Sequence, residues 1–203
     1  MICETSPLVL GSGSPRRREI LQTLAIPCRV LPCHVDETCR PDEDPLSYLS
    51  RIAILKLRDV ASVLDGQCFG GVLVADTIVL VDNQILGKPL DDAHAVRMLT
   101  SLSGRSHQVL TRFAVASPKD PSCAVHEETV CTVVEFRRLT DDEVLRYVAT
   151  GEGRDKAGGY AVQGIGGFAV SQIMGSYSNV VGLPACEVVV ALRRTGLLET
   201  YPV

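Results

Sequence analysis

The chain has 203 residues, and its 46% hydrophobic content is typical of a globular protein that buries about 70% of its unfolded surface. Lys and Arg number 20 against 24 Asp and Glu, and the resulting net charge of −4 argues against a protein that coats nucleic acid or an anionic membrane. We therefore expect a single domain over residues 1–203 that works with neither a nucleic-acid polymer nor a membrane.

The N-terminal residues and the cysteines indicate where the protein works. The chain does not open with a basic region followed by an apolar stretch of about 7–15 residues, so we expect no secretory signal and a cytoplasmic protein. The eight cysteines contain no C-x-x-C pair, which favours reduced, mostly structural thiols. A metal cluster at Cys33, His34 and Cys39 is the alternative, although zinc ligands are usually spaced more tightly.

The first half of the chain alternates predicted strands and helices. A short apolar run over 7–11 predicts a strand that ends at a glycine-serine turn, and Pro15 then begins a helix. A second strand over 28–31 leads through an acidic loop to a long amphipathic helix that begins near Asp44. The apolar residues 71–81 predict a long central strand, which forms a hairpin with the short strand after it.

The second half predicts a helix capped by Asp91, a hairpin of two strands, a helix that opens with a capping box, a further strand and a final helix. These elements are expected at residues 91–104, 108–116, 125–136, 140–150, 168–174 and 184–194. The alternation of strands and helices indicates an α/β fold with at least one mixed sheet.

The turn between the first strand and the first helix has the residue types of an anion site. Ser14 is the expected N-cap and Pro15 the first helical residue, but Arg16 and Arg17 place two cations at the positive end of the helix dipole. A phosphate there would meet backbone N–H groups, serine hydroxyls and guanidinium groups. The alternative is a solvated arginine cluster beside a glycine turn, since the segment matches neither a Walker loop nor G-x-G-x-x-G.

Asp76 lies within the apolar stretch 71–81, where an ionised carboxylate is costly unless it is paired or bound to a metal. We therefore expect Asp76 at a functional site, which would lie at the carboxyl end of its strand if a bend follows this residue. The alternative is a structural role, with a buried arginine as its partner or a neighbouring helix that it caps.

Two further carboxylates, Asp36 and Glu37, lie in the acidic loop, where a solvated loop is the simplest interpretation. If that loop folds toward Asp76, the carboxylates form an oxygen site suited to Mg²⁺ or Mn²⁺, with water and substrate phosphates as the remaining ligands. Lys56 and Lys88 are either phosphate ligands or lysines that extend along the surface.

Lys156 and Gln163 lie in DKAGGYAVQG, whose glycines permit close backbone packing. The amide of Gln163 either reads the edge of a base or is buried in a turn. Because the chain contains neither H-E-x-x-H nor G-x-S-x-G, a zinc hydrolase and covalent catalysis are both disfavoured.

Five sequence blocks follow one another along the chain: LVLGSGSPRRREIL, ADTIVLVDNQILGKP, LSGRSHQVLT, DKAGGYAVQG and GSYSNVVGLP. In these blocks, which reach from Leu8 to about Pro184, the chain resembles the Maf family of nucleoside triphosphate pyrophosphatases. The resemblance implies an α/β fold with a bent mixed sheet and flanking helices, in two lobes around a cleft, as in inosine triphosphate pyrophosphatases. It also implies a homodimer that hydrolyses the bond between the α and β phosphates of a nucleoside triphosphate, with Mg²⁺ or Mn²⁺ as cofactor.

The resemblance assigns roles to individual residues. Asp76 would be the proton acceptor that readies a water molecule. Glu37 would also be catalytic and would help Asp76 to hold the divalent ion. The residues that contact phosphate, of which Lys88 would also be catalytic, would be Ser12, Arg17, Lys56, Lys88 and Lys156.

Base specificity is expected from Arg16, Thr77 and Gln163, which lie where the subgroups of the family differ. The combination of SPRR, ADT and YAVQG resembles the dTTP- and UTP-hydrolysing branch, which implies a house-cleaning role in nucleotide pools. The alternatives are a pyrophosphatase for 7-methyl-GTP or other modified nucleotides, and a nucleotide-binding regulator of cell division without turnover. Gly11 and Leu57 depart from the alanines usual in the family.

Overall fold

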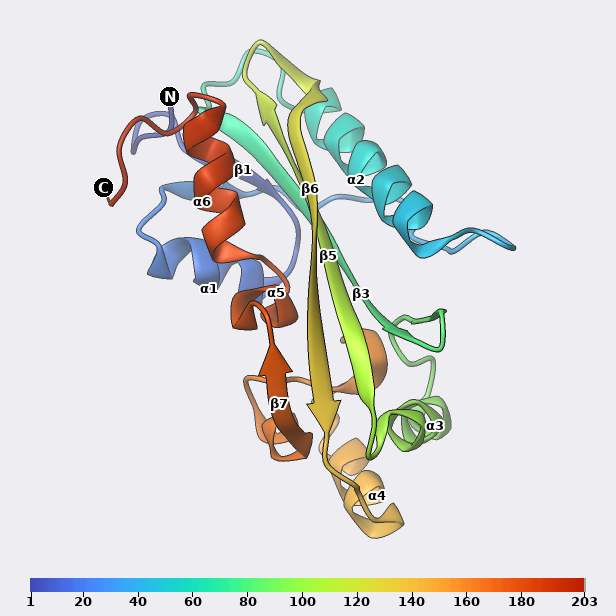
Figure 1. The fold of residues 1–203 in the computed structure, drawn as a ribbon. Coiled ribbons are helices and arrows are strands. Elements are labelled where there is room, and N and C mark those ends of the chain that lie inside the picture. Colours follow the sequence, from blue (N-terminus) through green and yellow to red (C-terminus); the bar gives the residue numbers. More distant parts are fainter. Residues whose placement is uncertain (203) are drawn as a thin grey trace. The chain divides into compact units, whose positions relative to one another are not determined.

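The computed structural model describes residues 1–202 (Figure 1). Its strands and helices are, in chain order, β1 (Leu8–Gly11), α1 (Pro15–Thr23), β2 (Cys28–Val30), α2 (Pro45–Ser62), β3 (Gly71–Val81), β4 (Gln84–Leu86), α3 (Asp92–Leu102), β5 (Ser106–Ser117), β6 (Asp120–Phe136), α4 (Asp141–Ala149), the 3₁₀ helices η1 (Ala157–Gly159) and η2 (Ile165–Ala169), β7 (Val170–Met174), α5 (Tyr177–Val181) and α6 (Ala185–Arg194). All the predicted strands and helices are present, although β6 begins at Asp120 rather than Val125. The prediction missed η1, η2 and α5, and η2 contains the first residues of the last predicted strand.

The strands within residues 1–202 form one mixed sheet of seven strands. Six follow the order β2-β1-β3-β5-β6-β7, and β4 pairs with β3. Strand β1 is parallel to both β2 and β3, whereas the β3–β4 and β6–β7 pairs are antiparallel. The predicted α/β fold, a mixed sheet with flanking helices, is therefore confirmed.

The chain divides into two compact units. Unit 1 comprises residues 1–76 and 111–130 with the C-terminal residues from 182 on, and unit 2 comprises residues 77–110 and 131–181. The division falls within β3, β5 and β6. In β3 the boundary lies directly after Asp76, which belongs to unit 1, and unit 2 begins at Thr77.

Helices cover both faces of the sheet in unit 1 (Figure 1). Leu73 and Ala75 of β3 pack in the core that contains α1 and α6, whereas Val72 and Val74 pack in the core that contains α2. Because successive side chains of a strand point to opposite faces, Asp76 follows Val74 onto the face that α2 covers. The pleat of β3 thus places a carboxylate under α2.

Strand β3 continues without interruption past Asp76, so the predicted strand over 71–81 is confirmed and the bend that would have placed Asp76 at a strand end does not occur. The residues after Asp76 are mostly apolar, and Val79 and Val81 pack in the core of unit 2. They therefore keep the chain extended, and Asp76 lies in the middle of the strand rather than at its carboxyl end.

Helix α2 begins at the N-cap that the sequence predicts. The carboxylate of Asp44 accepts hydrogen bonds from the N–H groups of Leu46 and Ser47, both at 3.1 Å, and Pro45 is the first helical residue. The residues on its buried face are Tyr48, Leu49, Ile52, Ala53, Lys56, Leu57 and Val60. A lysine on this face is carried toward the sheet rather than to the surface.

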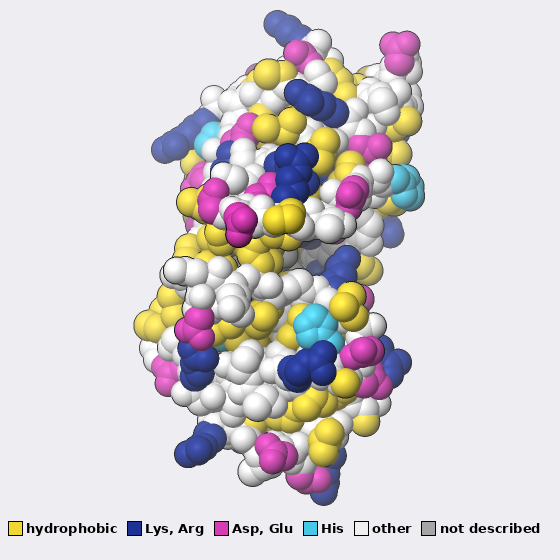
Figure 2. Space-filling model, turned by 90° about the vertical axis from the view of Figure 1, so that its right-hand side faces the viewer, with side chains coloured by type: hydrophobic (Ala, Val, Ile, Leu, Met, Phe, Trp, Pro, Cys, Tyr) yellow, Lys and Arg dark blue, Asp and Glu magenta, His cyan; other side chains and the backbone are white. Residues whose placement is uncertain are grey.

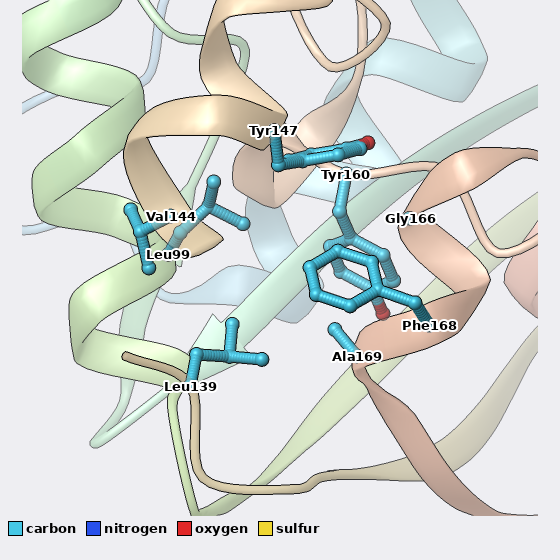
Figure 3. A pocket seen from close by; sticks show the side chains of 8 residues that line it. All are labelled: Leu99, Leu139, Val144, Tyr147, Tyr160, Gly166, Phe168 and Ala169. Carbon is cyan, nitrogen blue, oxygen red and sulfur yellow. The ribbon is translucent and has the colours of Figure 1, made fainter. Parts of the chain in front are cut away.

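Unit 2 has a core of its own, formed by β3, β5 and β6 with α3 and α4. As predicted, Asp91 caps α3 by accepting a hydrogen bond from the N–H of His94 at 2.6 Å, and Thr140 and Glu143 form a capping box on α4. Figure 3 shows a small pocket in this unit, lined by Leu99, Leu139, Val144, Tyr147, Tyr160, Gly166, Phe168 and Ala169. None of the lining residues is charged, so the pocket is unsuited to phosphate.

The core of unit 2 also buries His107, which is 3% exposed. Its Nε2 lies 2.8 Å from the hydroxyl of Tyr160, whereas its Nδ1 is buried without a hydrogen-bond partner among the described residues. Burial lowers the pKa of His107 from 6.5 to about 4, because the interior disfavours the charged ring.

This shift predicts an acid-sensitive fold. In the unfolded chain His107 binds a proton below pH 6.5, whereas in the folded chain it binds one only below about pH 4. Between these two pH values protonation therefore favours the unfolded chain. Above pH 6.5 neither state is protonated at His107, and the free energy of unfolding has its full value. It should fall by about 3 kcal/mol as the pH drops to 4. Urea denaturation at pH 7, 6 and 5 measures this loss. His107→Phe, which keeps the edge-to-face packing with Phe136 and Tyr160, should flatten the dependence. An equal pH dependence in His107→Phe and in a His94→Gln control, whose ring in α3 is only half-buried, would disprove the assignment.

Charged side chains of both signs are interspersed on the face of the molecule that Figure 2 shows, and no extended patch of one sign is visible there. This view agrees with the near balance of acidic and basic residues in the sequence. Within residues 1–202, every helix is too short or too polar to cross a membrane.

Candidate functional site

Lys56 and Asp76 form a buried ion pair between α2 and β3. The Nζ atom of Lys56 lies 2.7 Å from Oδ1 of Asp76, and the two side chains are 6% and 10% exposed. Lys56 also donates to the main-chain oxygen of Ala75 at 3.4 Å. A buried carboxylate is tolerated when a cation and hydrogen bonds compensate it, which explains how an apolar strand accommodates Asp76. The partner is a lysine, not the arginine considered as the alternative.

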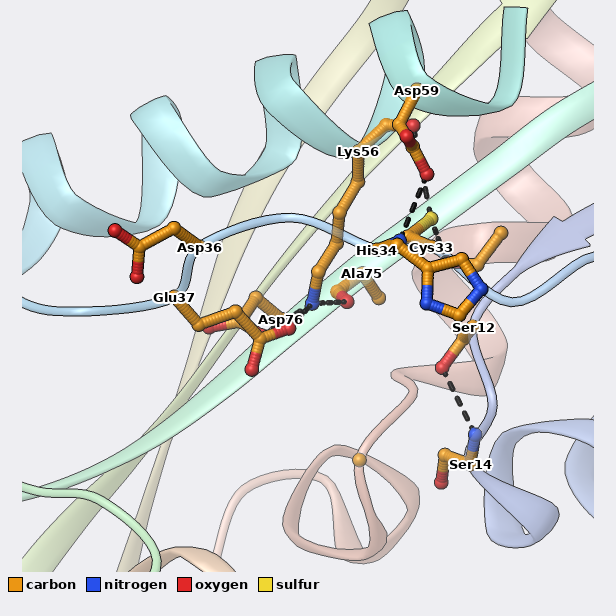
Figure 4. A network of polar contacts seen from close by, with 12 residues as sticks. Ser12, Ser14, Cys33, His34, Asp36, Glu37, Lys56, Asp59, Ala75 and Asp76 are labelled. Carbon is orange, nitrogen blue, oxygen red and sulfur yellow. Dashed lines mark hydrogen bonds and ion pairs between the residues drawn. The ribbon is translucent and has the colours of Figure 1, made fainter. Parts of the chain in front are cut away.

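Glu37 joins this pair from the acidic loop, residues 33–43. Its Oε1 lies 2.7 Å from Nζ of Lys56, and its side chain is 41% exposed. Figure 4 shows Glu37 turned toward Lys56 and Asp76, whereas the neighbouring Asp36 points away. The loop therefore folds toward Asp76 as the conditional prediction required, and it contributes one carboxylate rather than two. We call Glu37, Lys56 and Asp76 the carboxylate-lysine cluster.

The donor chemistry of this cluster fits a hard divalent cation. Two carboxylates and one ammonium group sum to a charge of −1, and carboxylate oxygens are the ligands that Mg²⁺ and Mn²⁺ prefer. Residues 1–202 contain no group of three or more His, Cys, Asp or Glu side chains that could hold a metal. An ion at Glu37 and Asp76 would therefore take its other ligands from water and from the substrate, as Mg²⁺ commonly does.

The glycine-serine turn is held together by Arg17, which is buried. The guanidinium donates to the main-chain oxygens of Gly182 and Ala75, both at 2.7 Å, and to Oγ of Ser12 at 3.0 Å. The same Oγ accepts the N–H of Ser14 at 3.2 Å. Arg17 thus links the turn, the carbonyl beside Asp76 and the segment that leads into α6. Its predicted contact with phosphate stays a prediction.

The buried position of Arg17 predicts a loss of stability on substitution. Arg17→Lys replaces the planar guanidinium group by a single ammonium group. The ammonium group cannot reach all three acceptors, the two main-chain oxygens and the hydroxyl of Ser12. We expect the free energy of unfolding to fall by about 2–4 kcal/mol, because buried hydrogen bonds to a charged group are lost. Urea denaturation measures this change, with the exposed Arg18→Lys as the matched control. If Arg17→Lys is as stable as Arg18→Lys and only binds nucleotide more weakly, the guanidinium is a substrate ligand rather than a clamp.

The remaining predicted residues are distributed over both units. Arg16, in the first turn of α1, is half-buried in unit 1. Thr77 (half-buried), Lys88 and Gln163 (both exposed) lie in unit 2. Lys156 also lies there, and its Nζ donates to the main-chain oxygen of Glu152 at 2.6 Å and to Asp155 at 2.5 Å. The substrate contacts assigned to these five residues stay predictions.

Helix α2 also holds the acidic loop, through residues that the sequence patterns did not single out. Tyr48 and Arg51 donate to main-chain oxygens of the loop, and Asp59 accepts a hydrogen bond from the N–H of His34 at 2.9 Å. A signal was present, because Tyr48 precedes Lys56 by eight residues, which is about two helical turns and places both on one face.

All eight cysteines are free thiols. The prediction that they are mostly structural is wrong, since six of them are exposed: Cys3, Cys39, Cys68, Cys123, Cys131 and Cys186. Cys33 is half-buried at the start of the acidic loop and donates to the main-chain oxygen of Gly11 at 3.2 Å. Burial raises its pKa to about 11, so this thiol is protonated at neutral pH.

Comparison with known proteins finds similar sequences that match nearly the whole chain. A family model described as Maf-like protein matches residues 7–195. The dTTP/UTP pyrophosphatase of Citrifermentans bemidjiense is 47% identical over 96% of this chain and 98% of its own length, and that of Geotalea uraniireducens is 46% identical over 98% and 100%. The solved structure of a HAM1 protein from Coxiella burnetii is 17% identical, covers 94% of this chain and 99% of that chain, and superposes with a TM-score of 0.49.

Proposed function

This chain belongs to the Maf-like protein family, and on that premise we propose that it is a pyrophosphatase that converts dTTP and UTP to the monophosphate and pyrophosphate. The observation that carries the proposal is the carboxylate-lysine cluster, in which Glu37 and Asp76 share the ammonium group of Lys56 at 2.7 Å each. Such a cluster offers a base for water beside groups that can neutralise phosphate charge.

In the proposed reaction a water oxygen bonds to one phosphorus of the α–β bridge, and the bond between that phosphorus and the bridging oxygen breaks. Asp76 accepts the proton of the water, and Lys56 orients its carboxylate through the ion pair at 2.7 Å. A divalent ion held by Glu37 and Asp76 would offset the charge that develops on the phosphates. Ser12, Arg17, Lys88 and Lys156 are the further phosphate contacts in this proposal.

Base selection is assigned to Arg16, Thr77 and Gln163. The relatives with 46–47% identity are named dTTP/UTP pyrophosphatases, which supports pyrimidine nucleotides as the substrates. An amide such as that of Gln163 can donate to and accept from the edge of a base, whereas a carboxylate can only accept. Gln163→Glu should therefore change the ratio of kcat/KM values between UTP and the purine nucleotides. An unchanged ratio would remove Gln163 from base recognition.

The test of the proposed function is product analysis. The purified protein is incubated with Mg²⁺ or Mn²⁺ and with dTTP, UTP, CTP, ATP, GTP or 7-methyl-GTP, and pyrophosphate is separated from orthophosphate. We expect pyrophosphate with dTMP or UMP. Preference for 7-methyl-GTP would indicate the branch of the family that hydrolyses this modified nucleotide. Release of orthophosphate would mean that the enzyme cleaves at the terminal phosphate. Nucleotide binding without turnover would favour a regulatory protein.

Two further properties belong to this proposal. A homodimer is implied by the family resemblance, and light scattering of the purified protein tests it. Metal dependence is tested by removing divalent ions with a chelator, which should abolish turnover, and by restoring it with Mg²⁺ or Mn²⁺.

A further inference from the structure

We propose that Tyr48 and Arg51 are positioning residues that hold the acidic loop on α2, so that the carboxylate of Glu37 stays beside Lys56 and Asp76. The proposal rests on the proposed function, because it gives two residues outside the reacting groups a task in that reaction.

Tyr48 fixes the main chain at Glu37. Its hydroxyl donates to the main-chain oxygen of Glu37 at 3.0 Å, and its side chain is 7% exposed on the face of α2 that carries Lys56. Burial raises the pKa of the phenol, so the hydroxyl remains a donor at neutral pH. The carboxylate of Glu37 is 41% exposed, so burial does little to fix it, and the position of its main chain matters more.

Arg51 fixes the next peptide. Its Nη2 donates to the main-chain oxygen of Thr38 at 3.0 Å, while Nε and Nη2 bind the carboxylate of Glu43 at 2.6 and 2.5 Å. Glu43 also accepts the N–H of Arg40 at 3.1 Å, which closes the far end of the loop. The hydrogen bonds from Arg51 lower the pKa of Glu43 to about 2, so the carboxylate of Glu43 stays ionised and paired with Arg51 at neutral pH.

Through the contacts of Tyr48 and Arg51, α2 holds both the loop that carries Glu37 and the lysine of the cluster. Tyr48 and Arg51 lie one helical turn apart and bind the consecutive carbonyls of residues 37 and 38, and Lys56 follows on the same helix. These contacts therefore fix the position of Glu37 relative to α2, the helix that carries Lys56. Without these contacts the loop would stay attached through Asp59 but would vary in position at Glu37.

The first test is a double-mutant cycle on kcat. Tyr48→Phe removes one hydroxyl and should lower kcat about three- to tenfold, the value of one hydrogen bond, with KM for UTP nearly unchanged. In a Glu37→Gln background, which lacks the carboxylate to be positioned, the same change should have almost no effect. An equal fold-change in both backgrounds, or no change in either, would overturn the proposal, since a general effect on the fold does not depend on Glu37.

Arg51→Met should lower kcat at least as much as Tyr48→Phe. The matched control is Arg137→Met in unit 2, because Arg137 also binds a glutamate, Glu143, at 2.7 Å and a main-chain carbonyl, that of Phe168, at 2.9 Å. The two variants lose similar contacts, so their urea midpoints should be similar while only Arg51→Met loses kcat. Equal loss of kcat in both would show that Arg51 supports the fold alone.

A binding measurement separates this proposal from the proposed function. Electron paramagnetic resonance counts free Mn²⁺ during titration of the protein with a UTP analogue whose α–β bridge is a methylene group, so no turnover is needed. Tyr48→Phe should weaken Mn²⁺ binding about threefold or more. Wild type that hydrolyses nothing would refute the proposed function, and the Mn²⁺ affinities would still decide the role of Tyr48. Equal affinities in wild type and variant, or no Mn²⁺ binding, would overturn the positioning role.

Discussion

Asp76→Asn is expected to lower kcat for UTP by about two to four orders of magnitude, the usual contribution of a general base. The amide keeps the shape of the side chain and can still accept a hydrogen bond from Lys56, but it cannot take a proton from water. Lys56 also keeps its contact with Glu37. We therefore expect the free energy of unfolding to change by less than about 2 kcal/mol, so the loss of activity is not a loss of fold.

Steady-state kinetics with pyrophosphate detection measures the effect, and urea denaturation followed by circular dichroism provides the control. KM should change less than kcat, because the predicted phosphate contacts are other residues. Near-normal turnover by Asp76→Asn would exclude this carboxylate as the proton acceptor. The cluster would then have a structural task only, and the base would have to be sought elsewhere.

The position of Asp76 could be predicted because an ionisable residue in an apolar strand is a strong local signal. The pattern of β3 also places Asp76 on the face of Val72 and Val74. Site residues of parallel sheets usually lie at strand ends, but no bend follows Asp76, because β3 supplies buried residues to the cores of both units. Here the requirements of packing prevail over the general rule.

Other parts of the site could not be read from local sequence. Asp36 and Glu37 are neighbours in a loop without periodicity, so only the family resemblance distinguished them before the structure did. Arg17 lies where a helix N-terminus attracts an anion, yet its burial depends on the carbonyl of Gly182, 165 residues away. The spacing of Tyr48 and Lys56 indicates that they share a face of α2, but the contact of Tyr48 with Glu37 depends on the path of the loop, which no spacing of residues predicts.

Lys56→Met is expected to be the most damaging substitution in unit 1, because it removes both the charge balance and the activity. The side chain of Asp76 is 10% exposed, so its carboxylate would remain buried without a cation. Breaking a buried pair by removing one partner costs about 3–5 kcal/mol, and we expect a loss of stability of that size in urea denaturation. Glu37 contributes less to this loss, because its side chain is 41% exposed and can turn into solvent.

A second substitution tests this explanation. Adding Asp76→Asn to Lys56→Met removes the buried uncompensated charge and should restore most of the stability without restoring any turnover. Adding Glu37→Gln instead should restore much less, because Glu37 is near the surface. Equal recovery by both second substitutions would contradict a buried pair between Lys56 and Asp76. Stability close to wild type in Lys56→Met alone would mean that solvent reaches Asp76, and that this carboxylate does not need the lysine as its partner in the strand.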